Sequence, residues 1–255
     1  MNSDAAVAFR TISSNADADT RIIWAHGWGQ SGQAFEPLAT AFAARAENLL
    51  IDFPGFGASP LPPDAWSTGD YADAVERWLG TLPPVTRTIW VGHSFGCRVG
   101  IQLAARHPER LERMVLIAAA GLKRKRTPVE QLRFRWRTTS FKLLKRLYTL
   151  TGRDPAVLSG RYGSADYRNA GALRPIFVKV ISEDLSDVAR RISCPVQLVF
   201  GSNDAETPPE FGTRYNSLIA GSKLAILDHQ DHYTVLGDGR HAVAKIISDF
   251  IKPNS

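Results

Sequence analysis

The stretch that decides the fold is Thr88-Ile89-Trp90-Val91-Gly92-His93-Ser94-Phe95-Gly96, an apolar run that passes into the pattern G-x-S-x-G. The apolar run predicts a buried strand, and Cys97 to His107 has the composition of a helix. A serine in a tight strand-to-helix turn needs small neighbours, because a larger side chain would collide with the turning backbone. Such a turn lifts the hydroxyl clear of the sheet and points the first backbone N–H groups of the helix at its target. We expect His93 to pack beneath the turn.

Strand and helix alternate on both sides of this turn, with one interruption. Short apolar runs, rather than alternating ones, are typical of strands that are buried on both faces of a parallel sheet. The predicted strands are residues 7–12, 21–25, 48–51, 87–91, 113–118, 196–200 and 223–227. The predicted helices are residues 33–45, 70–82, 94–107, 209–219 and 240–251. The sequence therefore predicts an α/β fold with a mostly parallel, doubly wound sheet.

The positive charge of the chain is concentrated in one segment. The net charge is +6, yet residues 121–190 alone contain 16 Lys and Arg against 6 Asp and Glu. The remaining residues hold 15 basic and 19 acidic side chains. The basic segment is also the one that interrupts the alternation of strands and helices. We therefore interpret it as an insertion with its own role.

Composition predicts a cytoplasmic enzyme. The hydrophobic content of 44% and charged content of 22% are ordinary for a globular protein. The start of the chain, Met1 to Asp4, lacks the features of a targeting segment, and no stretch approaches the roughly 20 apolar residues of a membrane span. We expect Cys97 and Cys194 to be small buried side chains rather than a disulfide or a metal pair.

Acidic and imidazole side chains follow two later predicted strands, at the point where each strand ends. Asp204 comes shortly after the strand 196–200, and both His229 and His232 come after the strand 223–227. Because the carboxyl ends of parallel strands meet at one edge of a sheet, these side chains are expected to lie near Ser94. A serine nucleophile needs a base, and the base needs an orienting acid. Glu206 is the alternative acid, and His229 is the alternative base.

With these motifs in chain order, the sequence resembles the α/β-hydrolase family over nearly its full length. His26-Gly27-Trp28-Gly29 is similar to the family's oxyanion loop, and Asp52 to Ser59 is similar to its D-x-x-G-x-G-x-S loop. The run from Cys194 to Asp204 is similar to the family's approach to the acid.

The resemblance implies an α/β-hydrolase fold with a Ser94, Asp204 and His232 triad. It also implies oxyanion donors at the backbone N–H groups of Phe95 and Trp28. His26 is expected to fix its loop by hydrogen bonding, and we count it with Trp28 among the residues around the substrate. No metal and no cofactor are expected.

The basic segment occupies the place where this family inserts a lid. We therefore divide the chain into a core, residues 1–120 and 191–255, and a helical lid, residues 121–190. Residues 130–150 predict a long amphipathic helix, whose residues Arg133, Trp136 and Arg137 are expected to contact the substrate. One interpretation is a lid helix with solvated charges. The other is recognition of an anionic partner: an acyl group on coenzyme A or on an acidic carrier protein, a phosphorylated lipid precursor, or a membrane surface.

The sequence thus predicts a serine hydrolase that cleaves a carboxylic ester or thioester through an acyl-enzyme. A nucleophilic serine disfavours the alkyl-ester chemistry of the dehalogenases and epoxide hydrolases of this fold, which use Asp. Two alternatives remain: a C–C bond hydrolase or lyase with the same triad, and a non-catalytic binder of an anionic partner. We expect a small-molecule ester or a carrier-bound acyl substrate, and no nucleic acid.

Overall fold

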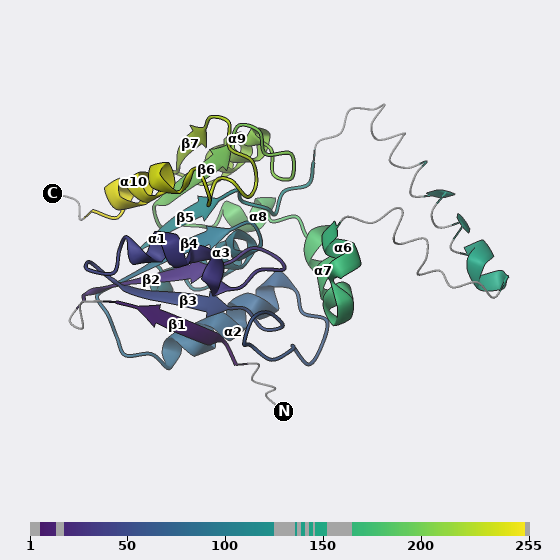
Figure 1. The fold of residues 1–255 in the computed structure, drawn as a ribbon, viewed down its shortest axis with the longest axis horizontal. Coiled ribbons are helices and arrows are strands. Elements are labelled where there is room, and N and C mark those ends of the chain that lie inside the picture. Colours follow the sequence, from purple (N-terminus) through teal and green to yellow (C-terminus); the bar gives the residue numbers. More distant parts are fainter. Residues whose placement is uncertain are drawn as a thin grey trace.

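The computed structural model describes residues 6–13, 18–124, 136, 139–140, 143–144, 146–151 and 165–252 (Figure 1). The strands are β1 (Ala8–Ile12), β2 (Thr20–Ala25), β3 (Glu47–Asp52), β4 (Arg87–His93), β5 (Arg113–Ile117), β6 (Val196–Gly201) and β7 (Lys223–Leu227). The helices of the core are η1 (Gly32–Phe35), α1 (Glu36–Thr40), α2 (Thr68–Gly80), α3 (Phe95–Arg106), η2 (Pro108–Arg110), α9 (Pro209–Leu218) and α10 (Arg240–Phe250). Within residues 121–190, the helices whose bounds the structure describes are α6 (Ala165–Asn169), η3 (Gly171–Leu173), α7 (Arg174–Ser182) and α8 (Ser186–Ala189).

The seven strands form one sheet in the order β1-β3-β2-β4-β5-β6-β7. β1 pairs with β3 in antiparallel fashion, and every other neighbouring pair is parallel. The chain winds outward from β2 and β4 in both directions, as in a doubly wound α/β sheet. The predicted fold class is confirmed.

Helices cover both faces of the sheet (Figure 1). Successive residues of a strand point to opposite faces, so Ile22 and Trp24 of β2 belong to one core cluster and Ile23 and Ala25 to the other. The first cluster contains side chains of α1 and α10, and the second contains side chains of α2, α3, α8 and α9. Both faces of the central strands are therefore buried, which explains their continuous apolar sequences.

Two of the predicted helices differ in position or extent from those in the structure. α2 begins two residues earlier than predicted, because Ser67 and Asp70 form a reciprocal capping box at its start. The predicted helix 33–45 is only η1 and α1, and residues 41–43 continue as turns whose amides bond three residues back. Such turns keep Phe35, Leu38 and Phe42 on one buried face, so the spacing of apolar residues did not reveal the change.

α7 and the residues after it pack on α2 and α3. The buried Arg98 of α3 donates a hydrogen bond of 2.9 Å to the carbonyl of Val180 in α7. The carboxylate of Glu183, directly after α7, accepts a 3.0 Å bond from the amide of Thr68. Of the predicted helix 130–150, the structure describes residues 136, 139–140, 143–144 and 146–150, and all of these are helical. The boundaries of the insertion at 121 and 190 stay a prediction.

Both cysteines are free, and Cys97 is fully buried. Among the described residues, no helix is both long and apolar enough to cross a bilayer.

Candidate active site

The turn between β4 and α3 has the strained geometry that its glycines allow. Ser94 has a positive φ of 48° and a ψ of −100°, and its side chain makes no capping bond to α3. A Cβ on Gly92 would lie 2.8 Å from the backbone of Gly96. A Cβ on Gly96 would lie 2.0 Å from the carbonyl oxygen of Ala25 in β2. The close backbone contacts therefore leave no room for a side chain at either position, which explains the two glycines of the G-x-S-x-G pattern.

Replacing Gly96 by alanine is expected to destabilise the fold by about 1–3 kcal/mol, because neither β2 nor the turn can move without breaking the sheet. Urea unfolding measures the loss. Gly80 supplies the control: a Cβ there would meet only Arg110 Nη2, at 3.7 Å. G80A should therefore stay within about 0.5 kcal/mol of the parent. Equal stabilities of G96A and G80A would contradict this account of the turn.

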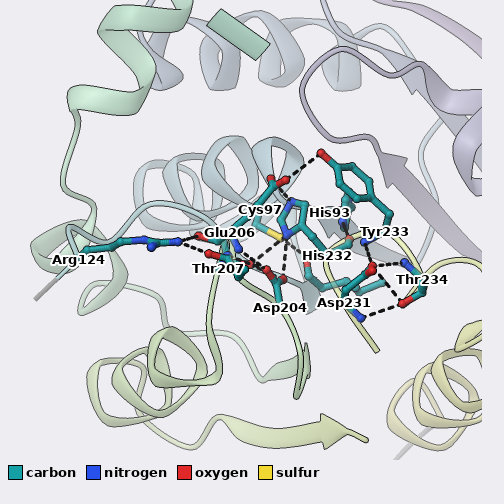
Figure 2. Close-up of polar contacts among 12 residues, drawn as sticks. His93, Cys97, Arg124, Asp204, Glu206, Thr207, Asp231, His232, Tyr233 and Thr234 are labelled. Atoms are coloured by element: carbon teal, nitrogen blue, oxygen red, sulfur yellow. Dashed lines mark hydrogen bonds and ion pairs between the residues drawn. The ribbon is translucent and has the colours of Figure 1, made fainter. Parts of the chain in front are cut away.

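Asp204 and His232 meet at the carboxyl end of the sheet (Figure 2). Asp204 follows β6, His232 follows β7, and Nδ1 of His232 lies 2.8 Å from Oδ2 of Asp204. The Asp204 side chain is fully buried, and that of His232 is 6% exposed. His229, the alternative base, is exposed, and its backbone has a positive φ of 60°. The structure thus brings His232, and not His229, to the buried acid.

Asp204 is held in its ionised form. Its Oδ1 accepts bonds of 2.8 Å from the amides of Glu206 and Thr207, and its Oδ2 accepts one from the Thr207 hydroxyl. Burial alone would raise the pKa of Asp204, but the bonds from His232 and Thr207 outweigh it and hold that pKa below its usual value. A carboxylate in this position favours the histidine tautomer with a proton on Nδ1, which leaves a lone pair on Nε2.

Glu206, the alternative acid, lies at the other nitrogen of the same ring. Its Oε2 is 3.5 Å from Nε2 of His232, and its side chain is 50% exposed. Its Oε1 also accepts a hydrogen bond of 3.1 Å from the hydroxyl of Tyr233. Among the described residues, no hydrogen bond joins the hydroxyl of Ser94 to Nε2 of His232. Bonds between a nucleophile and its base are commonly long in unliganded enzymes and shorten when substrate binds.

The two residues expected to supply the oxyanion donors contact each other through their rings. The rings of Trp28 and Phe95 are 5.4 Å apart and edge to face, and neither backbone amide donates a hydrogen bond within the described part of the chain. The Trp28 ring also contacts Phe56, at 5.0 Å, and Phe177 of α7, at 5.0 Å. Trp28 therefore belongs to an aromatic wall beside the Ser94 turn, to which α7 contributes one ring.

His26 is fully buried, and both of its ring nitrogens are engaged within the protein. Nε2 accepts a 3.1 Å bond from the amide of Phe53, which fixes the proton on Nδ1, and Nδ1 donates a 2.7 Å bond to the carbonyl of Gly27. Burial lowers the pKa of His26 to about 4, so the ring is neutral. This geometry ties the Trp28 loop to the loop after β3, and leaves neither nitrogen for a substrate.

Of the three expected lid residues, one is among the described residues. Arg133 and Arg137 lie outside the described residues. Trp136 is described, and its side chain is 76% exposed, so it is not packed against the triad residues. In the part of the chain that the structure describes, no group of three or more His, Cys, Asp or Glu side chains is arranged to hold a metal ion.

Sequence reasoning missed Thr207. Its hydroxyl donates to Asp204 and lies 3.2 Å from Nδ1 of His232, so it touches both members of the pair. A sequence signal exists for this contact. An aspartate often forms a turn in which its carboxylate accepts hydrogen bonds from the backbone amides two and three residues later, and the third residue here is Thr207.

Comparisons with known proteins agree with the fold. The sequence model of the alpha/beta hydrolase family matches residues 22–246, so the chain belongs to this family. The pimeloyl-[acyl-carrier protein] methyl ester esterase of Neisseria meningitidis serogroup A is 28% identical over 250 residues, which cover 92% of this chain and 78% of that protein.

The enzyme of the same name from Chromobacterium violaceum is 30% identical over 203 residues, which cover 73% of this chain and 77% of that protein. Among solved structures, a hydrolase from Pseudomonas aeruginosa has a TM-score of 0.73 at 22% identity, and the match covers 97% of this chain and 94% of that one. The class expected from the sequence, a carboxylesterase-like hydrolase with the α/β-hydrolase fold, is confirmed.

Proposed function

We propose that this chain hydrolyses a carboxylic ester of an acyl chain through a Ser94, His232 and Asp204 triad. His232 Nε2 takes the proton of Ser94, and the Ser94 oxygen attacks the ester carbonyl. The tetrahedral oxyanion accepts hydrogen bonds from the amides of Trp28 and Phe95. The leaving alcohol takes the proton from His232, and the acyl group stays on Ser94. Water, deprotonated by His232, then releases the acid.

The observation that carries this proposal is the buried 2.8 Å contact between His232 Nδ1 and Asp204 Oδ2, with the His232 ring 4.9 Å from the ring of His93, the residue before Ser94. A buried carboxylate beside an imidazole is costly unless the pair is satisfied, and here four donors serve the carboxylate. Such a buried, satisfied pair is expected where the imidazole must gain and lose a proton during turnover.

We propose further that the acyl chain is presented on an acidic carrier protein. Support comes from the relatives, whose names give an acyl-carrier-protein methyl ester as their substrate. The surplus of ten basic side chains in residues 121–190 also favours an anionic partner. In this proposal residues 121–190 form the lid, and the contact between Trp28 and Phe177 supports a lid that borders the acyl pocket.

Reversing the charge of Arg133, Arg135 and Arg137 to Glu is expected to lower kcat/KM for a carrier-bound methyl ester by about tenfold or more, because association is steered by charge. The same variant should turn over a small neutral ester at the parent rate. The matched control reverses three basic residues of the core, Arg45, Arg240 and Lys245, and should leave both substrates unaffected. An equal change for both substrates in the lid variant would exclude carrier recognition by these arginines.

A panel of substrates tests the reaction class. Wild-type protein is assayed on a p-nitrophenyl ester, an acyl thioester and a β-diketone, with S94A in parallel. Ester turnover that S94A lacks supports the proposal. Turnover of the β-diketone alone would move the assignment to C–C bond hydrolysis. A protein that turns over none of the three and resists labelling by a fluorophosphonate would be a binder, and the proposal would be wrong.

A further inference from the structure

One buried histidine lies between the three parts of the candidate site and has no role in the mechanism above. His93 precedes Ser94 in the chain and is 1% exposed. Its Nε2 lies 2.8 Å from the carbonyl oxygen of His232, 139 residues away in sequence. The rings of His93 and His232 are 4.9 Å apart at an angle of 47°. A Cβ on Gly27, in the loop of Trp28, would lie 2.8 Å from its Nδ1.

The direction of this hydrogen bond is fixed by its partners. The acceptor is a carbonyl oxygen, so Nε2 of His93 must carry the proton and donate. Nδ1 has no hydrogen-bond partner among the described residues. In this tautomer Nδ1 is an acceptor, and a buried acceptor without a partner is tolerated better than a buried donor. Burial, with a further contribution from His232, lowers the pKa of His93 to about 3, which keeps the ring neutral.

The bond from His93 joins two loops that are otherwise held separately. The loop of His232 is tied to the loop after β6, where the amide of Asn203 donates to the carbonyl of Gln230 at 2.9 Å. The turn of Ser94 is tied to β5, where its amide donates to the carbonyl of Ile117 at 3.0 Å. Within the part of the chain that the structure describes, the His93 bond is the one that links the Ser94 turn to the His232 loop.

We propose that His93 is a positioning residue, which fixes the backbone of His232 relative to Ser94 by donating its Nε2–H to the His232 carbonyl. This inference rests on the proposed function, because it assigns His93 a task only if Ser94 and His232 react together. Proton transfer from Ser94 to His232 needs the two side chains within about 3 Å, and an error of 1 Å can cost about 100-fold in rate. A short, buried hydrogen bond from a neutral ring holds the Ser94 turn and the His232 loop in this relation at every pH at which the enzyme works.

The experiment compares two variants of nearly equal size. In His93→Gln the amide Nε2–H can occupy the place of the imidazole Nε2–H, and His93→Met has the same chain length without a donor. We expect H93Q to retain kcat within about threefold of wild type and H93M to lose about 10- to 100-fold, with KM unchanged in both. A role in packing alone would affect both variants alike. Equal kcat values for H93Q and H93M would overturn the inference.

A second measurement does not depend on the activity of a variant, so it still tests the inference if H93M does not fold. Side-chain ¹⁵N NMR of wild-type protein at pH 7, with the His93 signals assigned by their loss in H93Q, should show a neutral ring protonated at Nε2. A ring protonated at Nδ1, or at both nitrogens, would overturn the inference. Failure of the proposed function is distinguishable, because wild-type protein itself would then lack turnover that depends on Ser94, and the role of His93 would be excluded with it.

Discussion

Replacing Ser94 by alanine is expected to lower kcat/KM for a carboxylic ester by at least about 10⁴-fold. The residual rate would come from the oxyanion donors and substrate binding, which remain in place. The fold should be unaffected, because the Ser94 side chain makes no capping hydrogen bond and alanine meets the same backbone conformation. Steady-state kinetics gives the rate, and thermal unfolding verifies the fold.

Ser217 supplies the matched control for this substitution. It lies on α9, where its hydroxyl donates a 2.7 Å bond to the carbonyl of Arg214. S217A should keep the full kcat/KM. An S94A variant with more than about a tenth of the parent activity would show that Ser94 is not the nucleophile, because loss of a nucleophile costs far more than that.

Replacing Asp204 by asparagine is expected to lower kcat by about 10⁴-fold, a magnitude taken from serine proteases in which the equivalent change was made. The carboxylate accepts from Nδ1 of His232, so Nε2 is left free to accept a proton. An amide NH₂ group in that place would favour the opposite tautomer and block the base. The low pKa of Asp204 keeps the carboxylate ionised across the neutral range, so pH dependence near neutrality should not report its titration.

Substitutions of two neighbouring acids, Asp231 and Glu206, test whether the loss of activity is specific to Asp204. Asp231 precedes His232 and accepts bonds from the amides of Tyr233 and Thr234, so D231N tests a local effect on the loop. E206Q tests the acid at Nε2. Both should cost less than about tenfold in kcat, because neither contacts Nδ1. A large loss in E206Q together with a small loss in D204N would assign the acid to Glu206 and contradict the proposed triad.

The pattern of the sequence predicted the core of the fold because local rules determine it. Buried parallel strands need continuous apolar runs, and the Ser94 turn needs small residues at 92 and 96. Both features therefore depend on residues that are near one another in the sequence. The helix predicted at 33–45 was wrong in extent, because turns with bonds three residues back bury the same face as a helix. The spacing of apolar residues cannot separate the two.

The site was predictable only in part, because its decisive contacts join distant segments. Local patterns placed Asp204 and Glu206 in one loop and His229 and His232 in another, and only the resemblance to the family favoured Asp204 and His232. The fold gives the physical reason, because Asp204 is buried at Nδ1 while Glu206 is half exposed at Nε2. The bond between His93 and His232 could not be predicted either, because no local signal relates residues 139 positions apart.

The most direct test of the account is to trap the acyl-enzyme. Wild-type protein is mixed with a p-nitrophenyl ester, quenched in acid within the first turnover, digested and analysed by mass spectrometry. We expect the mass of one acyl group on the peptide that contains Ser94, and no such adduct in S94A. An acyl group on a different residue, an adduct that persists in S94A, or rapid turnover without any adduct would contradict the claim that Ser94 is the nucleophile.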